Sequence, residues 1–259
     1  MTDDLLNLTY QSFGQMEGME VYQTHLENMV HSAASTSSKV TVLRLESVLV
    51  EGKGFASSQA LEVPSLLRSI AGAVENGTEA VAIGNGFDPG LWEARELFDV
   101  PILGLFETAI FYAIRVGWRV GVLCSGNSGL ARIEELAARY GISSRLVRPE
   151  AVGVTVPNIV TGFQDSAVAD QLLTATDASI EMLRRRGAEL VIIASGALDV
   201  FFHAHRDRAT SAIPVLPGVQ ILVRETETAA ALARLGVPFI SRVGRFAQPP
   251  ASVMRSLNN

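Results

Sequence analysis

The sequence predicts an α/β protein with two doubly wound parallel-sheet lobes, related by approximate two-fold symmetry, and an active site between them. Short apolar runs alternate along the chain with amphipathic stretches of helical period. Hydrophobic residues make up 48% of the 259 residues, which is typical of sheets that helices cover on both faces. The chain also partly repeats itself, so the two lobes are expected to resemble each other.

The expected strands are short apolar runs bounded by turn residues. They cover residues 5–9, 40–45, 80–83, 102–105, 120–123, 190–194, 215–216 and 238–240. Apolar residues at helical spacing within residues 63–74, 130–137 and 169–183 predict amphipathic helices between the strands. Strands that alternate with helices in this way form parallel sheets with right-handed crossovers.

The internal repeat relates residues 79–88 to residues 189–199. In this alignment Asn85-Gly86 pairs with Ser195-Gly196, and each pair follows an expected strand. Such a pair alone is an ordinary turn. Open parallel sheets, however, bind ligands at the carboxyl ends of their strands. The recurrence of the pair at matched places therefore predicts that both turns line one cleft.

The two lobes are expected to interleave along the chain. The first lobe covers residues 1–118, with a C-terminal return of about residues 237–259, and the second covers residues 119–236. This division follows from a strand that begins near Arg119 and from the expected strand near Phe239, which would rejoin the first lobe.

The composition excludes several classes of partner. The net charge of −6 provides no basic field for nucleic acid. The single cysteine excludes an internal disulfide and a cysteine-rich metal site, and it suits a reducing compartment. The first residues are acidic where a signal peptide is basic. The longest apolar stretch, residues 100–114, contains Glu107 and is too short to cross a bilayer. A cytoplasmic protein with no membrane partner is expected.

One motif resembles a known family. The segment Asp88-Pro89-Gly90-Leu91, with residues 94–97, 100–104 and 107–109 downstream, resembles the first lobe of hydantoin and allantoin racemases, and residues 191–196 resemble the matching second-lobe segment. The chain is thus similar to the Asp/Glu/hydantoin racemase superfamily. The resemblance implies an isomerase-type enzyme without cofactor or metal, a small carboxylate or cyclic amide as its ligand, and a homo-oligomer.

The chain departs from this superfamily at the two catalytic cysteines. By resemblance, their positions hold Asn85 and Ser195. Two-base racemisation needs a thiolate on one face of a carbon atom and a thiol on the other. An amide cannot act as a base, and a serine hydroxyl is a poor base unless another group activates it. Racemisation through these two positions is therefore not expected.

The two turns retain hydrogen-bond donors that can hold an anion. The expected donors at the turns are the backbone amides of Gly86 and Gly196 and the side chains of Asn85 and Ser195. A further donor is Ser125, which follows another strand. Such groups bind a carboxylate or stabilise an enolate or oxyanion as its charge develops.

Cys124, Glu107 and Asp88 each allow more than one interpretation. Cys124 ends a strand just before a helix, so it is either a relocated nucleophile or base in the cleft or a small buried apolar residue. Glu107 either lines the cleft and contacts the substrate or serves only the structure. Asp88 is expected to cap the helix that follows it.

His203 and His205 lie past the second turn, on an expected surface helix. No convincing third ligand accompanies them, so no metal site is expected. A histidine here is nevertheless the nearest candidate in the sequence to activate Ser195.

These observations leave three functions open. The leading one is an enzyme that stabilises an enolate or oxyanion between Asn85 and Ser195. The second is a hydrolase or lyase on the same ligands, with Ser195 or Cys124 as its nucleophile. The third is a non-catalytic protein that binds a small acid. A base within hydrogen-bond reach of Ser195 favours the hydrolase, whereas a sealed cleft without titratable groups favours the binding protein.

Overall fold

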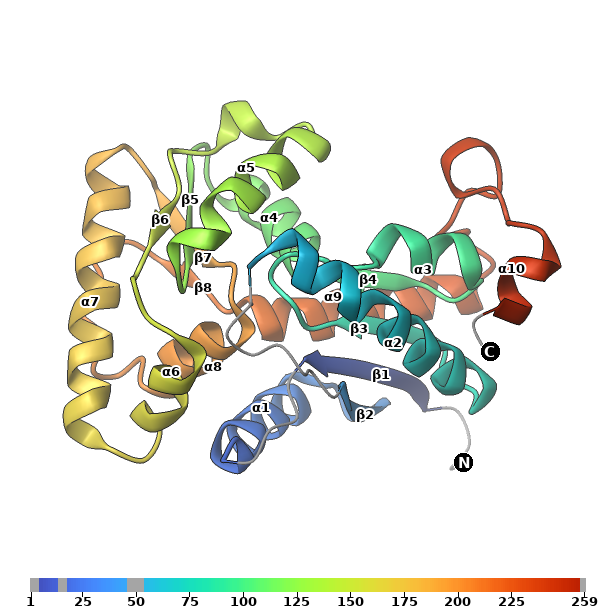
Figure 1. Ribbon diagram of the computed structural model, residues 1–259, viewed down its shortest axis with the longest axis horizontal. Helices are drawn as coiled ribbons and strands as arrows, with labels where there is room; N and C mark the ends of the chain where they lie inside the picture. The colour runs from blue at the N-terminus through green and yellow to red at the C-terminus, as the bar shows by residue number, and fades with distance from the viewer. Residues whose placement is uncertain (1–4, 14–17, 46–53, 257–259) are drawn as a thin grey trace.

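The computed structural model describes residues 5–13, 18–45 and 54–256, which form two parallel sheets with helices around them (Figure 1). The strand order is β2-β1-β3-β4 in the first sheet and β6-β5-β7-β8 in the second. The first sheet contains β1 (Leu6–Phe13), β2 (Ser38–Leu45), β3 (Ala80–Ile83) and β4 (Ile102–Gly104), and the second contains β5 (Val120–Cys124), β6 (Glu150–Ala151), β7 (Leu190–Ile193) and β8 (Val215–Leu216). The predicted fold class, with two parallel-sheet lobes, is confirmed.

Both sheets follow the same path, which is the structural form of the internal repeat. β3 lies between β1 and β4, and β7 lies between β5 and β8. Every residue of β3 and β7 is buried, because helices cover both faces of these central strands. The turns at Asn85-Gly86 and Ser195-Gly196 follow these two strands at their carboxyl ends.

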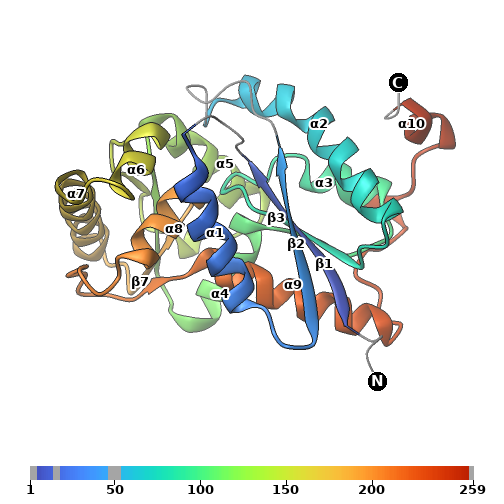
Figure 2. The same cartoon turned by 90° about the horizontal axis from the view of Figure 1, so that it is seen from below.

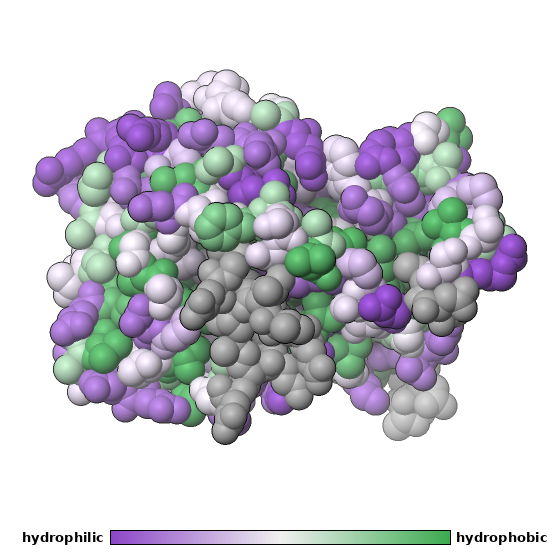
Figure 3. All heavy atoms as spheres, viewed as in Figure 1, coloured by the Kyte–Doolittle hydropathy of each residue, from purple (hydrophilic) through white to green (hydrophobic). Residues whose placement is uncertain are grey.

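The helices are amphipathic. They are α1 (Glu20–Ala33), α2 (Ala56–Glu75), α3 (Leu91–Leu97), α4 (Leu105–Val116), α5 (Leu130–Arg139), α6 (Val156–Gly162), α7 (Ser166–Arg185), α8 (Gly196–Ala204), α9 (Gly218–Arg234) and α10 (Ala251–Ser256). Side-chain hydrogen bonds cap three of them, α6, α7 and α8. The Asp165 carboxylate accepts hydrogen bonds from two backbone amides of the first turn of α7. α5 buries Ile133 and exposes Glu134 and Glu135, and hydrophilic residues gather over it on the surface (Figure 3). No described helix is long and apolar enough to cross a membrane.

Two helices exchange lobes and hold the sheets together. α4 follows β4 of the first sheet but packs against β7 of the second. α9 follows β8 of the second sheet and packs against β1, β3 and β4 of the first, which it runs alongside in the two ribbon views (Figure 2). One buried cluster contains Tyr10 and Leu26 together with Leu123 and Ile193. The two lobes therefore share a core.

The structure corrects the expected strand at residues 238–240, which lie in no strand. This segment follows Gly236, whose φ of 79° ends α9. The ring of Phe239 packs against the guanidinium group of Arg95, 5.4 Å from the ring centroid. Arg242 donates hydrogen bonds to carbonyl groups at the end of α3, including that of Phe98 at 2.6 Å. Side-chain contacts, and not strand pairing, attach this segment to the first lobe.

The first sheet also differs from the prediction at β1. The sequence predicts a strand at residues 5–9, whereas β1 continues to Phe13, because every residue from Leu6 to Phe13 pairs with β2. β6, which the sequence analysis does not predict, is only Glu150–Ala151. Two residues are too short for a periodic pattern.

Candidate functional site

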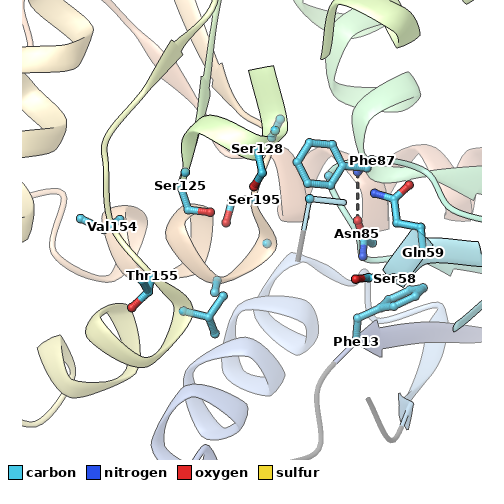
Figure 4. Close-up of a pocket in the computed structure, with 18 of the residues that line it drawn as sticks. Phe13, Ser58, Gln59, Asn85, Phe87, Ser125, Ser128, Val154, Thr155 and Ser195 are labelled. Atoms are coloured by element: carbon cyan, nitrogen blue, oxygen red, sulfur yellow. Dashed lines mark hydrogen bonds between the residues drawn. The ribbon is translucent and has the colours of Figure 1, made fainter. Parts of the chain in front are cut away.

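A cavity of about 450 Å³ lies where the carboxyl ends of the two sheets meet. Its described walls come from both lobes (Figure 4). The sequence-predicted residues Asn85, Gly86, Ser125, Ser195 and Gly196 all line it. The structure thus brings together five residues from three segments that are far apart in the sequence.

Asn85 is held in place by its own turn. Its Oδ1 atom accepts a hydrogen bond from the backbone amide of Phe87 at 3.0 Å. Because the oxygen is used in this way, the Nδ2 hydrogens are the donors that Asn85 can offer to a ligand.

Ser195 occupies the N-cap of α8, where its Oγ atom accepts from the backbone amide of Leu198 at 3.5 Å. A hydroxyl that accepts from an amide can still donate its proton, so Ser195 can donate to an oxygen in the cavity. Ser125 lies on the same side of the cavity as Ser195, opposite Asn85 (Figure 4).

The two turns touch each other. A Cβ atom added to Gly86 would lie 2.3 Å from the carbonyl carbon of Ala194 and 2.8 Å from the amide nitrogen of Ser195. A Cβ atom added to Gly196 would lie 3.1 Å from the carbonyl oxygen of Gly84. Only glycine allows the first turn to approach the second so closely.

Further walls of the cavity come from residues that the sequence analysis did not single out. α2 contributes Ser58, Gln59 and Glu62, and the segment leading into α6 contributes Val154, Thr155, Val156 and Pro157, while Phe13, Met19, Tyr22 and Phe87 add apolar and aromatic surface. The polar residues of α2 carried a signal in the sequence. Gln59 and Glu62 continue the helical spacing of the buried Leu66 and Ile70 toward the start of the helix, where a polar face is unexpected.

Cys124 does not line the cavity. It is buried, and its thiol donates to the Gly126 carbonyl at a sulfur–oxygen distance of 3.3 Å. Burial, and to a smaller degree the charge of Glu150, raises the pKa of Cys124 to about 12. A thiol in this environment is protonated, so the placement favours the structural interpretation of Cys124 over the nucleophile.

Glu107 also lies outside the cavity walls. Arg95 pairs with both of its carboxylate oxygens, at 2.8 and 2.5 Å. Asp88 accepts from the backbone amides of Phe106 and Glu107 at 2.9 and 2.8 Å. Asp88 therefore caps α4, not α3 as the sequence suggested, and this corrects the assignment. Glu107 serves the same junction between the first turn and α4.

The expectation that His203 lies on a surface helix is wrong. α8 is a buried helix, and the His203 side chain is only 6% exposed. Its Nε2 atom lies 3.5 Å from the carboxylate of the fully buried Asp199. His203 lines a separate hollow of about 290 Å³ and does not line the cavity. The described residues contain no group of three potential metal ligands.

Comparison with known proteins gives the family. The sequence profile described as Asp/Glu/Hydantoin racemase matches residues 19–226. This chain belongs to that family. Among its relatives, the hydantoin racemase of Rhizobium meliloti is 26% identical over 195 residues, which cover 74% of this chain and 76% of that protein. The hydantoin racemase of Pseudomonas sp. (strain NS671) is 27% identical over 182 residues, 67% of each chain.

Solved structures agree on the fold of this racemase-family chain. The allantoin racemase from Klebsiella pneumoniae superposes with a TM-score of 0.78 at 20% identity and covers 94% of both chains. Glutamate racemase isoform RacE1 from Bacillus anthracis superposes with a TM-score of 0.60 at 11% identity, over 98% of this chain and 94% of that one.

Proposed function

We propose that this protein is a cofactor-independent enzyme of the Asp/Glu/hydantoin racemase superfamily that acts on a small carboxylate or cyclic amide. The observation that carries the proposal is the meeting of Asn85-Gly86 and Ser195-Gly196 in one cavity. These turns occupy matched places in the two lobes. Membership of the family and the hydantoin racemases among the relatives support the ligand class.

The proposed chemistry is stabilisation of an enolate or oxyanion. Asn85 Nδ2 and the Ser195 hydroxyl donate from opposite sides of the cavity, and Ser125 adds a third donor (Figure 4). Donors fixed in advance around an oxygen that gains charge in the transition state lower the barrier without having to reorganise. Apolar and aromatic side chains in the walls lower the local dielectric constant, which strengthens these hydrogen bonds.

Two-thiol racemisation is not part of this proposal. Asn85 and Ser195 stand where, by resemblance, the family carries its catalytic thiols, and the single cysteine of the chain lies outside the cavity walls. We expect that this protein does not invert aspartate, glutamate or simple hydantoins. The hydrolase alternative, with Ser195 as nucleophile, loses support because Ser195 Oγ accepts a hydrogen bond from the backbone amide of Leu198, which is not a base.

Ligand binding and conversion test the proposal together. Purified protein is melted with and without 5-methylhydantoin and, separately, L-aspartate, and the recovered compounds are examined by NMR. A ligand that binds the folded state raises the Tm. We expect a rise with at least one compound, and loss of that rise in a protein carrying both Asn85→Ala and Ser195→Ala. A rise that survives in the double variant would place the ligand elsewhere and overturn the proposal. Bound ligand that is never converted would leave the binding-protein alternative.

A further inference from the structure

One wall of the cavity is a polar face on α2, which is separate from the turns at Asn85-Gly86 and Ser195-Gly196. Ser58, Gln59 and Glu62 lie on the same side of this helix, because residues three and four positions apart are neighbours on a helix surface. Their exposures are only 7%, 6% and 6%. Burial of polar side chains destabilises a protein unless hydrogen bonds or function compensate for it. What this face can offer a ligand therefore depends on how its side chains are oriented.

The amide of Gln59 is oriented by the opposite lobe. Arg132 of α5 donates to Gln59 Oε1 at 2.9 Å, and the same guanidinium group pairs with Glu135. Because Arg132 can only donate, the amide must present its oxygen to Arg132 and its nitrogen elsewhere. Gln59 Nε2 is buried and has no hydrogen-bond partner among the described residues. Gln59 lines the same cavity as Asn85 and Phe87 (Figure 4). A buried, oriented donor at a cavity wall is suited to a ligand oxygen.

Glu62 lies about one turn further along the same face. Among the described residues that line the cavity, it is the one carboxylate, and none of the others is a histidine, lysine, arginine or cysteine. Tyr22 is the other ionisable side chain of these walls, and burial raises its pKa, which keeps it protonated. Proton transfer in this cavity therefore has one conventional base within its described walls.

We propose that α2 carries the proton-transfer group of this site: the Glu62 carboxylate takes a proton from the ligand while Gln59 donates a hydrogen bond to the oxygen on which charge develops. This inference rests on the proposed function, because it assigns the base that the cradle at Asn85 and Ser195 lacks.

The step balances without a co-reactant. The C–H bond next to a carbonyl group breaks, its proton passes to a Glu62 carboxylate oxygen, and its electron pair forms the C=C bond of an enolate. The enolate oxygen accepts from Gln59 Nε2 and from the Ser195 hydroxyl. In the return step the protonated Glu62 gives a proton back to carbon and the carbonyl group re-forms.

A single base on one wall has a stereochemical consequence. It removes and returns the proton on the same face of the carbon, so hydrogen exchanges with solvent while the configuration is retained. Inversion requires a second proton donor on the opposite face. Asn85 and Ser195 do not supply that second group, because neither titrates in a useful range.

The test follows exchange and binding in the same samples. Single enantiomers of 5-methylhydantoin and L-aspartate are incubated in D₂O with wild-type protein, Glu62→Gln, Glu62→Asp and Glu75→Gln. Glu75 is an exposed carboxylate at the far end of the same helix, so its variant is the matched control. NMR measures deuterium at the carbon, chiral chromatography measures configuration, and thermal melting measures binding and folding.

We expect wild-type protein and Glu75→Gln to exchange at least one compound with retention. Glu62→Gln should keep the ligand-induced rise in Tm and lose exchange by at least about a hundredfold, the usual contribution of a general base. Glu62→Asp should retain partial exchange, and it settles the matter if Glu62→Gln fails to fold. If Glu62→Gln exchanges deuterium at the wild-type rate, the role of Glu62 is overturned. The same follows if wild-type protein binds a compound without exchanging it. Both outcomes leave the binding site intact. If neither compound binds wild-type protein, the proposed function falls for these ligands, and the role of Glu62 falls with it.

Discussion

The turns after β3 and β7 occupy equivalent places in the two lobes, yet they are packed differently. A Cβ atom on Gly86 of the first turn would collide with the backbone between Ala194 and Ser195, whereas one on Gly196 of the second turn would meet its nearest atom, the Gly84 carbonyl oxygen, at 3.1 Å. The approximate symmetry is thus broken where the lobes touch. The first turn is the closely packed partner, and the second turn, with Ser195 at a helix N-cap, has more room to change.

An aspartate anchors each of the two turns, and these aspartates are also similar in role but different in backbone conformation. Asp88 accepts from the first amides of α4, and Asp199 accepts from the amides of Gly218 and Val219 at the start of α9. The sequence repeat places these aspartates one position out of alignment. The φ of 47° at Asp88 is a left-handed conformation that aspartate tolerates, and it accompanies the shorter first turn. Both lobes therefore keep an aspartate that caps the next helix, and the backbone conformation at Asp88 compensates for the one-residue difference in turn length.

The largest expected effect is a difference in stability between alanine variants of Gly86 and Gly196. Gly86→Ala would force a Cβ atom to 2.3 Å from backbone atoms that cannot move aside, so we expect a loss of several kcal/mol, about 4 or more, or failure to fold. Gly196→Ala meets its nearest neighbour at 3.1 Å, and we expect a loss of about 1 kcal/mol. Urea denaturation of both variants measures the difference. Equal stabilities would show that the turns are not packed as described.

The second effect separates Ser195 as a donor from Ser195 as a structural cap. Ser195→Ala should lower turnover on the order of a hundredfold, the usual cost of one donor to an oxyanion. Its cap hydrogen bond is long, 3.5 Å, so the loss of stability should stay below about 1 kcal/mol. Steady-state kinetics beside thermal melting distinguish the roles. Unchanged turnover together with a lowered Tm would make Ser195 a cap only.

Much of this arrangement could be predicted from the sequence, and the limits have physical causes. β3 and β8 match their predicted bounds because a short apolar run bounded by turn residues leaves few alternatives. The pairing of Asn85 with Ser195 followed from the repeat. The partners of Asp88 could not be predicted, because the helix that it caps begins far along the chain. The role of the polar face of α2 could not be predicted, because Gln59 is oriented by Arg132, which lies far along the chain in the other lobe.

The third effect concerns pH and compares the two buried aspartates. Burial, and then the negative charge of Glu107, raises the pKa of Asp88 to about 7, against the hydrogen bonds that lower it. The folded state therefore holds a proton that the unfolded state has released above its ordinary pKa near 4, so stability falls as the pH rises from about 4 to about 7 and levels off above that. Between pH 5 and pH 8 we expect a fall on the order of 2 kcal/mol from this group.

The control for this pH effect is Asp88→Asn, which cannot titrate. Its stability should be flatter over the same range, measured by urea denaturation at several pH values. Asp199 also has a raised pKa owing to burial, but His203 beside it opposes the shift. A wild-type profile that rises between pH 5 and pH 8, or an equal slope in Asp88→Asn, would show that Asp88 stays ionised.

The smallest expected effect concerns Cys124. It tests whether this residue lies behind the cavity wall or forms part of the wall. A Cβ atom added to Gly129, which does line the cavity, would lie 3.2 Å from the Cys124 sulfur, so the thiol packs directly behind that wall. Cys124→Ala removes one sulfur atom and its weak hydrogen bond to Gly126, and we expect about 1 kcal/mol of lost stability. Turnover should change by less than about threefold, because a thiol with a pKa of about 12 supplies almost no thiolate at neutral pH. Alkylation by iodoacetamide should also be slow in the folded protein. Rapid alkylation, or loss of activity in Cys124→Ala with an unchanged Tm, would return Cys124 to the mechanism and weaken the assignment of proton transfer to Glu62.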